Sequence, residues 1–303
     1  MKNKNMSSIQ KQLWLLCLLP MLSVFIFNYI PMFGIIIAFK NYKYQKGIFG
    51  SAWNGFDNFK FFFSSNEFTK ITRNTIGLNL IFIIASIFCA VAVAILLFDL
   101  TSRNKTKVFQ TILITPYFIS WVIVSYMVYA LLNPEFGIIN NLLQSMGMNK
   151  ILWYSEAKYW PAILTVSFVW KSVGMDCIVY YASLMGIDST LFEAAEIDGA
   201  SKLRKTWSIT IPSLIPLITV LTIMKIGNIF RADFGLFYQV TRNVGVLYET
   251  TDVIDTYIFR SLRTSSNMGI SAAVGLLQSV VGFVLVVITN TSVKKINPDN
   301  ALF

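Results

Sequence analysis

The chain has 303 residues, of which 55% are hydrophobic and only 13% are charged, and its mean hydropathy is +0.61. This composition is too apolar for a soluble domain and is typical of a protein that crosses a membrane several times. The formal net charge of +10 favours contact with anionic lipid headgroups over binding of nucleic acid in a protein of this class.

Six apolar segments are long enough to cross a bilayer as helices. They cover residues 13–39, 74–98, 108–132, 159–185, 213–230 and 270–292. The predicted fold is therefore all-α, with one transmembrane domain over residues 1–303. An even number of spans places both termini on one side. Lysine and arginine are about equally numerous on the two sides, so charge alone leaves the orientation open.

Three longer segments connect spans on the side opposite the termini. Residues 40–73 carry Trp53, Phe56, Phe59 and the triplet Phe61–Phe63, and this richness in aromatic rings predicts an amphipathic helix at headgroup depth. Residues 133–158 and 231–269 carry further aromatic and polar side chains. All three offer aromatic and polar surface on that side of the membrane.

Residues 186–212 form a polar interruption between the fourth and fifth spans, here called the 186–212 loop. Thr190 followed by Glu193 predicts a capped short helix. Asp198 and Gly199 predict its end, because glycine adopts left-handed dihedrals without steric cost. Ser201 is expected to cap a second short helix, and Pro212 suits the first turn of the next span. Taken alone, the acidic side chains are better explained as a capped, solvated surface helix than as a functional site.

Three ionisable residues fall inside predicted spans, Lys171 and Asp176 in the fourth and Lys225 in the fifth. Each costs roughly 2.5–3.5 kcal/mol if it faces lipid, so all three are expected to face protein or water. Lys171 and Met175 share one helix face, whereas Asp176 is turned away. One interpretation is an Asp176–Lys225 pair that holds two spans together. The other is a translocation path whose surplus cation favours an anionic or polar solute.

Aromatic and amide side chains near the predicted path are further candidates. Tyr117, Trp121 and Asn228 could stack on a sugar or form hydrogen bonds with it, although packing or a position in an interfacial aromatic belt would also explain them.

Several residue types that carry chemistry are missing or isolated. Histidine is absent, and Cys17, Cys89 and Cys177 lie in apolar runs without metal-ligand spacing, which predicts small buried side chains. The chain contains no GxxxxGK[ST] or GxGxxG phosphate loop. We therefore expect no metal, no cofactor, no bound ATP and no catalytic residue.

The 186–212 loop matches a pattern with two fixed spacings: EAA, three residues, G, nine residues, and I-x-L-P. The matching residues are Glu193, Ala194, Ala195, Gly199, Ile209 and Pro212, with Asp198 before the glycine and Ile211 in place of leucine. This resembles the signature loop of permease subunits of type I ABC importers. The resemblance implies that the loop is cytoplasmic, and so are both termini, and that the loop seats in a cleft of a separate ATPase.

Longer stretches narrow the resemblance. They begin at Thr115 (TPYFISWVIVSYMVYALLNPEFGIIN), Trp170 (WKSVGMDCIVYYASLMGID), Asp233 (DFGLFYQVTRN), Val253 (VIDTYIFRSL), Ala273 (AVGLLQSVVGF) and Asn297 (NPDNALF). They resemble carbohydrate permeases of aldouronate-type, lipoprotein-dependent oligosaccharide importers, found chiefly in Gram-positive bacteria.

That resemblance implies a plasma-membrane subunit that imports an oligosaccharide. Its implied partners are a second permease, two ATPase subunits or a shared ATPase homodimer, and an extracellular binding lipoprotein. Two other functions stay open. An ion-coupled secondary transporter could use Asp176 and the intramembrane lysines, and a membrane-bound glycosyl transferase would need a carboxylate pair or metal site.

Overall fold

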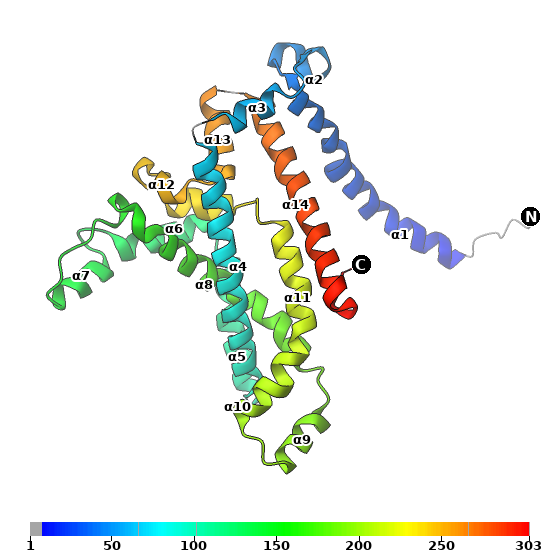
Figure 1. The fold of residues 1–303 in the computed structure, drawn as a ribbon, viewed down its shortest axis with the longest axis vertical. Coiled ribbons are helices and arrows are strands. Elements are labelled where there is room, and N and C mark those ends of the chain that lie inside the picture. Colours follow the sequence, from blue (N-terminus) through cyan, green and yellow to red (C-terminus); the bar gives the residue numbers. More distant parts are fainter. Residues whose placement is uncertain (1–7, 66, 101, 266, 303) are drawn as a thin grey trace, which may run out of the picture. The chain divides into compact units, whose positions relative to one another are not determined.

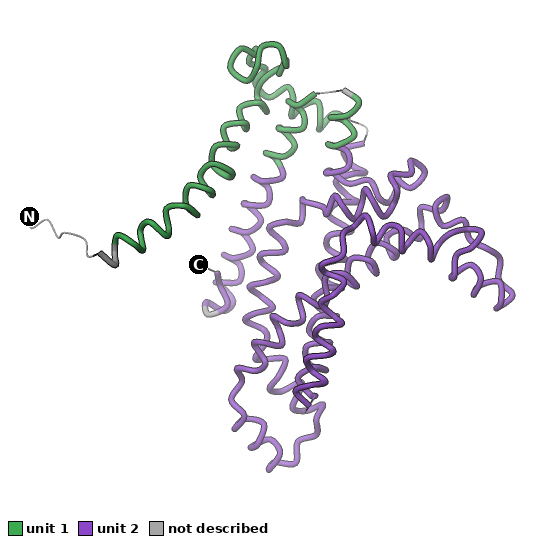
Figure 2. The backbone as a smooth tube through the Cα atoms, turned by 180° about the vertical axis from the view of Figure 1, so that it is seen from behind, with its two compact units in different colours: residues 1–65, 258–277 green, residues 66–257, 278–303 purple. Residues whose placement is uncertain are grey.

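The structure, a computed structural model, describes residues 8–65, 67–100, 102–265 and 267–302, and it is almost entirely helical (Figure 1). Within those residues, five helices are long and apolar enough to cross a membrane, or up to six when a bent helix pair counts as one span. The chain divides into two compact units, residues 1–65 with 258–277 and residues 66–257 with 278–303 (Figure 2).

The first unit begins with the predicted first span. Helix α1 (Ser8–Val24) continues through a π-helical turn (Phe25–Tyr29) into a 3-10 helix (Ile30–Phe39). A hairpin of two short strands follows, in which β1 (Lys40–Asn41) pairs antiparallel with β2 (Ala52–Trp53). The connection between the strands contains a 3-10 turn (Tyr44–Lys46) and α2 (Gly47–Gly50). Helix α3 (Asp57–Phe63) completes the segment.

The helix expected within residues 40–73 is the short α3, because most of the segment forms the hairpin and turns. Several aromatic rings pack together beside it. The ring of Phe39 lies 5.7 Å from that of Trp53, 5.6 Å from Phe56 and 5.4 Å from Phe59. Phe62 is fully buried. The prediction for the cysteines fails in part: Cys177 is buried, Cys89 is half-buried, and Cys17 on α1 is exposed.

The second unit contains the long helices α4 (Phe68–Phe98) and α8 (Trp160–Leu184), which pack along each other, and α11 (Ile211–Gly227) (Figure 1). Helix α14 (Met268–Ile296) starts in the first unit and ends in the second, before a 3-10 turn (Pro298–Asn300). One apolar cluster joins α4, α8 and α11 through Ala90, Leu97, Cys177, Leu184 and Leu214. These helices cover most of the second, fourth, fifth and sixth predicted spans, although α4 begins six residues before the second one.

The third predicted span, residues 108–132, is not one straight helix. Helix α5 (Arg103–Ile114) leads into a 3-10 turn (Thr115–Phe118), and α6 (Trp121–Leu132) then starts at an angle of 98°. Pro116 explains the interruption, because proline has no N–H to donate and its ring clashes with the preceding helical turn. The side chain of Ser120 caps α6 by accepting from the Ile123 N–H at 3.4 Å.

The two later connecting segments are folded and not open loops. Residues 133–158 contain α7 (Ile138–Ser145) and two 3-10 turns, Trp153–Ser155 and Ala157–Tyr159. Between α11 and α14 lie a π-helical turn (Leu236–Val240), a 3-10 turn (Gly245–Leu247), α12 (Tyr248–Thr251) and α13 (Ile254–Ser265). Part of this stretch is core: a second apolar cluster joins Leu236, Phe237, Val240, Leu247 and Val253 to α4, α6 and α8.

Candidate functional site

The 186–212 loop contains one separate helix, α9 (Ser189–Ile197), at one end of α4 and α11, with α12 toward the other end (Figure 1). The predicted cap at Thr190 is wrong by two residues. Asp188 is the cap instead, because its Oδ1 accepts from the Thr190 N–H at 3.0 Å. That hydrogen bond lowers the pKa of Asp188, since it stabilises the charged form.

The remaining local predictions for the loop are confirmed, except that the second helix is not isolated. Gly199 has φ +71, Ser201 caps α10 (Lys202–Lys205) by accepting from the Arg204 N–H at 3.3 Å, and Pro212 lies in the first turn of α11. Helix α10 continues through a π-helical turn (Thr206–Thr210), which holds Ile209, directly into α11. The fifth span therefore begins inside the loop.

Two glutamates on α9 have different surroundings. Lys205 Nζ lies 2.5 Å from Glu196 Oε1 and ties α9 to α10, and this hydrogen bond and charge lower the pKa of Glu196. Among the described residues, the exposed carboxylate of Glu193 has no hydrogen-bond or ion-pair partner. The signature glutamate is thus free to bind something outside the chain, whereas the next one closes the loop.

The loop also exposes large apolar side chains. Ile197 is 88% exposed, Leu203 74% and Trp207 69%. Apolar groups of this size beside charged ones are typical of a protein-binding surface. Ala194 is exposed and Ala195 is half-buried on the same helix, and Asp198 follows at its C-terminal end.

The intramembrane pair predicted from the sequence is present. Lys225 Nζ lies 2.6 Å from Asp176 Oδ2 and donates to Ser86 Oγ at 3.1 Å, so it joins α11 to α8 and α4. The two charged side chains are 27% and 28% exposed. Mutual neutralisation lowers the cost of placing both charges inside a membrane.

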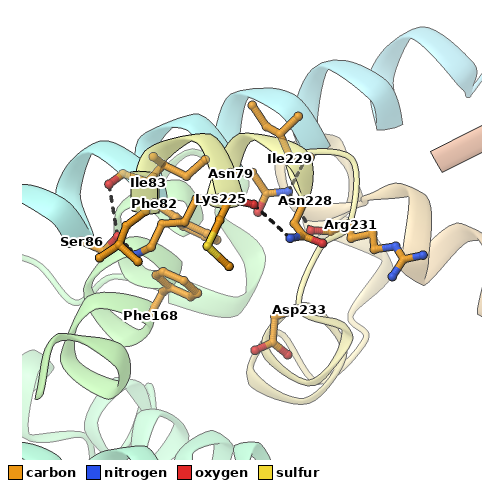
Figure 3. A pocket seen from close by; sticks show the side chains of 12 residues that line it. Asn79, Phe82, Ile83, Ser86, Phe168, Lys225, Asn228, Ile229, Arg231 and Asp233 are labelled. Carbon is orange, nitrogen blue, oxygen red and sulfur yellow. Dashed lines mark hydrogen bonds between the residues drawn. The ribbon is translucent and has the colours of Figure 1, made fainter. Parts of the chain in front are cut away.

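A cavity of about 390 Å³ adjoins this pair between α4, α8 and α11 (Figure 3). Its polar lining includes Asn79, Ser86, Lys225, Asn228, Arg231 and Asp233. Of the predicted path residues, Lys225 and Asn228 line the cavity. Asp176 is not a lining residue but forms the ion pair with Lys225. Asn228 donates its own amide to Met224 O at 3.1 Å. Met175 is exposed on α8 and is not among the lining residues.

Sequence reasoning missed the polar residues that hold the rim of this cavity. Asn79 donates to the carbonyls of Ile229 (2.8 Å) and Arg231 (3.2 Å). Asp255 accepts from the Ala232 N–H at 2.8 Å, and Gln278 donates to Phe230 O at 2.6 Å. Burial raises the pKa of Asp255. No sequence pattern marks Asn79, a single polar residue in an apolar run, or Gln278, whose only polar neighbour in its run is Ser279. Arg231 and Asp233 could have been noted because they directly follow the fifth span.

Lys171 contacts the break in the third span. Its Nζ donates to the carbonyls of Pro116 (3.4 Å), Tyr117 (2.7 Å) and Ile119 (2.6 Å). It also lies 5.6 Å from the ring centroid of Tyr117 and 5.3 Å from that of Trp121. A lysine has three donors, and here all three have carbonyl acceptors. The geometry therefore favours a role in closing the break, because carbonyls freed from a helix need partners at membrane depth.

Trp121 connects the break to the cavity, since its Nε1 donates to Asp233 Oδ2 at 2.7 Å. A side chain at Gly235 would collide with the Trp121 ring, and one at Gly174 would collide with the Leu113 carbonyl. Glycine is thus required at position 235, where the backbone approaches α6, and at position 174, where α8 approaches α5. Within the described residues, no group of three or more His, Cys, Asp or Glu could hold a metal ion.

The comparisons with known proteins agree with this arrangement. Residues 103–298 match the family model described as "binding-protein-dependent transport system inner membrane component". The chain is 33% identical to protein LplB of Bacillus subtilis, over 97% of this chain and 92% of LplB. It is 32% identical to the polygalacturonan/rhamnogalacturonan transport system permease protein YteP of the same organism, over 96% and 90% of the two chains.

Solved structures give the same result. A chain of a bacterial alginate ABC transporter, crystallised with an alginate pentasaccharide-bound periplasmic protein, superposes with a TM-score of 0.83 at 33% identity. The match covers 94% of this chain and 96% of that one. A second structure of an importer of alginate gives a TM-score of 0.84 at 31% identity over the same shares. The chain therefore belongs to the family of inner membrane components of binding-protein-dependent transport systems.

Proposed function

We propose that this chain is the permease subunit of an ATP-driven importer that moves an acidic oligosaccharide into the cell. The observation that carries the coupling is the free carboxylate of Glu193 beside exposed apolar side chains on α9, in a family whose members work with other components. The resemblance of the loop to the signature of ABC permeases supports a separate ATPase as the partner of this surface.

The substrate class rests on two independent points. Relatives and structural neighbours carry polygalacturonan, rhamnogalacturonan or alginate in their names. In this chain, the cavity of about 390 Å³ has two cations, Lys225 and Arg231, and one acid, Asp233, in its lining. Since Lys225 is paired with Asp176, Arg231 is the cation best placed to meet a carboxylate.

Each group of residues has its own role in this proposal. The ATPase contacts Glu193, Ala194, Ala195, Asp198 and Gly199, and Ile209 and Pro212 join the loop to α11. The substrate passes Lys225 and Asn228, with Asp176 as the counter-ion. Tyr117, Trp121, Lys171 and Met175 form the adjoining wall, where Lys171 holds the backbone.

The subunit performs no catalysis of its own in this proposal. ATP binds to two ATPase subunits or to a shared homodimer, a second permease completes the path, and a binding lipoprotein delivers the sugar from outside. Both termini and the 186–212 loop lie in the cytoplasm of a Gram-positive bacterium. Two relatives from Bacillus subtilis support that source.

The test is reconstitution of the whole transporter in proteoliposomes, with ATP hydrolysis measured with and without substrate-loaded binding protein. Glu193→Lys is expected to abolish the stimulation while the chain still inserts, because a reversed charge opposes docking. Asp99→Lys is the matched control, since Asp99 is an exposed carboxylate at the end of α4, outside both the 186–212 loop and the segments expected to meet the binding protein. Full stimulation in the Glu193→Lys protein would refute the coupling role.

The rival function is an ion-coupled transporter that uses Asp176 and Lys225. It predicts uptake that continues without the ATPase and stops with an uncoupler. Our proposal predicts that uptake into the same vesicles stops without the ATPase and continues with an uncoupler.

A further inference from the structure

A second cavity, of about 220 Å³, lies in the second unit and shares no lining residue with the first. Its walls come from α6 and from the stretch that follows the fifth span. Its polar lining residues are Ser125, Tyr126, Tyr238, Gln239, Arg242 and Asn243. The cavity is therefore rich in hydrogen-bonding groups although it adjoins a helix of the broken span.

One face of α6 forms a wall of this cavity. Tyr129 lies four residues after Ser125 and three after Tyr126, so it shares a helix face with each of them. Tyr126 is 64% exposed. The guanidinium carbon of Arg242 lies 4.1 Å from the ring centroid of Tyr129, within the range of a cation–π contact. Tyr129 thus fixes the position of the Arg242 guanidinium but does not neutralise its charge.

The backbone that presents Arg242 is strained. Arg242 has φ 55 and Asn243 has φ 52, and within the described residues no other non-glycine residue has a positive φ. Two such residues in sequence persist only where the surroundings enforce them. Here the Tyr248 hydroxyl donates to Asn243 O (3.2 Å) or Oδ1 (2.9 Å), and the Asn243 N–H donates to Thr241 Oγ1 at 3.3 Å.

The charge of Arg242 is uncompensated. Among the described residues, no carboxylate lies within ion-pair distance of it. The nearby acidic group is Tyr154, whose hydroxyl donates to Val240 O at 3.3 Å. Burial raises the pKa of Tyr154 to about 12, against the opposing effect of Arg242, so the hydroxyl stays neutral at physiological pH. The cavity therefore carries a net positive charge.

We propose that this cavity is an outer subsite in which Arg242 binds the carboxylate of one acidic sugar unit during import. A guanidinium can bind a carboxylate with two parallel hydrogen bonds. The amides of Gln239 and Asn243 are available to sugar hydroxyls, and the exposed Tyr126 ring can cover the apolar face of the sugar. The inference rests on the proposed function, since it assumes an acidic oligosaccharide.

The experiment uses the complete transporter in proteoliposomes with its binding protein. It compares uptake of a uronic-acid oligosaccharide with uptake of the same oligosaccharide after its carboxylates are reduced to alcohols, each at saturating loading of the binding protein. Arg242→Gln is expected to slow uptake of the acidic sugar about tenfold and to leave the reduced sugar unchanged. Arg242→Lys should restore part of the rate.

Arg263→Gln is the matched control, because Arg263 is an exposed arginine over an aromatic ring, that of Phe259, and does not line the cavity. An equal loss for both sugars, with weaker docking of the binding protein, would overturn the subsite and assign Arg242 to a protein carboxylate. No change for either sugar would also overturn it. If the wild-type transporter imports only the reduced sugar, the proposed acidic substrate itself fails, whatever Arg242 does.

Discussion

Lys171 and Lys225 are both lysines inside membrane spans, and their hydrogen bonds give them different roles. Lys225 shares its charge with Asp176, whereas Lys171 donates to backbone carbonyls at the break. A count of charges would treat the two as equivalent members of one path. The partner of each ammonium group decides what a substitution does.

The Asp176–Lys225 pair is best tested with a double-mutant cycle. Asp176→Asn and Lys225→Met are each expected to lower the free energy of unfolding by on the order of 3 kcal/mol, because each leaves one charge unpaired within the spans. The double variant should recover most of that loss. Thermal unfolding in detergent measures all three, and additive losses would show that the two charges do not stabilise each other.

Lys171→Met keeps the apolar stem of the side chain but removes all three donors. We expect a loss of stability on the order of 2 kcal/mol, because the carbonyls of residues 116, 117 and 119 lose their partner. Uptake of acidic and of neutral sugars should fall by the same factor. Lys158→Met, which removes an exposed lysine, is the control. A loss confined to the acidic sugar would show that Lys171 contacts the substrate after all.

At the scale of the element, helix ends and breaks depend on contacts that are distant in the sequence. Thr190 and Asp188 are both good caps two residues apart, and the sequence pattern does not choose between them. Pro116 is visible in the sequence, but the 98° bend depends on Lys171, about fifty residues later, and on the space that Gly174 leaves for Leu113. The Asp176–Lys225 pair could be predicted because an apolar span offers few other partners.

The approach of α11 to α14 requires glycine. A side chain at Gly282 would collide with the carbonyl of Gly227, and small residues allow such close packing between membrane helices. Gly282→Ala should lower the free energy of unfolding by about 1–3 kcal/mol. Gly275→Ala on the same helix has open space and should raise it by about 1 kcal/mol. Thermal unfolding compares the two, and a shift of the same sign would contradict the packing argument.

The ion pair that closes the 186–212 loop is pH-dependent. Since Lys205 lowers the pKa of Glu196, the pair stabilises the loop fully above the ordinary glutamate pKa of about 4.3. This stabilisation is lost as the pH falls through the lowered pKa. The protection factor for hydrogen exchange in α9, which corrects for the intrinsic pH dependence of exchange, should therefore fall in acid. The pKa of Asp188 is also lowered, and Asp188 is present in both proteins, so Glu196→Gln isolates the pair by reducing the pH dependence.

At the scale of the molecule, the order of spans predicts which segments share a side. One membrane span, α11, separates the 186–212 loop from residue 246. In a cysteine-free background, Ile197→Cys and Val246→Cys place thiols at positions that are 88% and 63% exposed. A membrane-impermeant maleimide applied to intact cells should label position 246 and not 197. Labelling of both, or of 197 alone, would contradict the orientation.

Much of the whole fold could be predicted from the sequence, because five of the six predicted spans correspond to single apolar helices, although the helix at residues 202–227 begins eleven residues before the predicted fifth span. The connecting segments could not, since Leu236, Phe237 and Val240 form part of the core yet lie between polar residues. The cavity could be predicted only in part. Lys225 and Asn228 are polar residues near the end of a span, but Asn79 and Asp255 acquire their roles only when α4 and α13 meet the end of α11.

The continuity of α10, the π-helical turn and α11 has a mechanical consequence. Residues 202–227 form one helical path of 26 residues, and Lys225 lies 20 positions beyond Lys205, or about 30 Å at the rise of an α-helix. A rigid lever of that length that tilts by about 5° at the loop displaces its far end by about 3 Å. That displacement is comparable to the Lys225–Asp176 contact distance of 2.6 Å, so a small stroke at the loop end would suffice to separate the pair and change the width of the cavity.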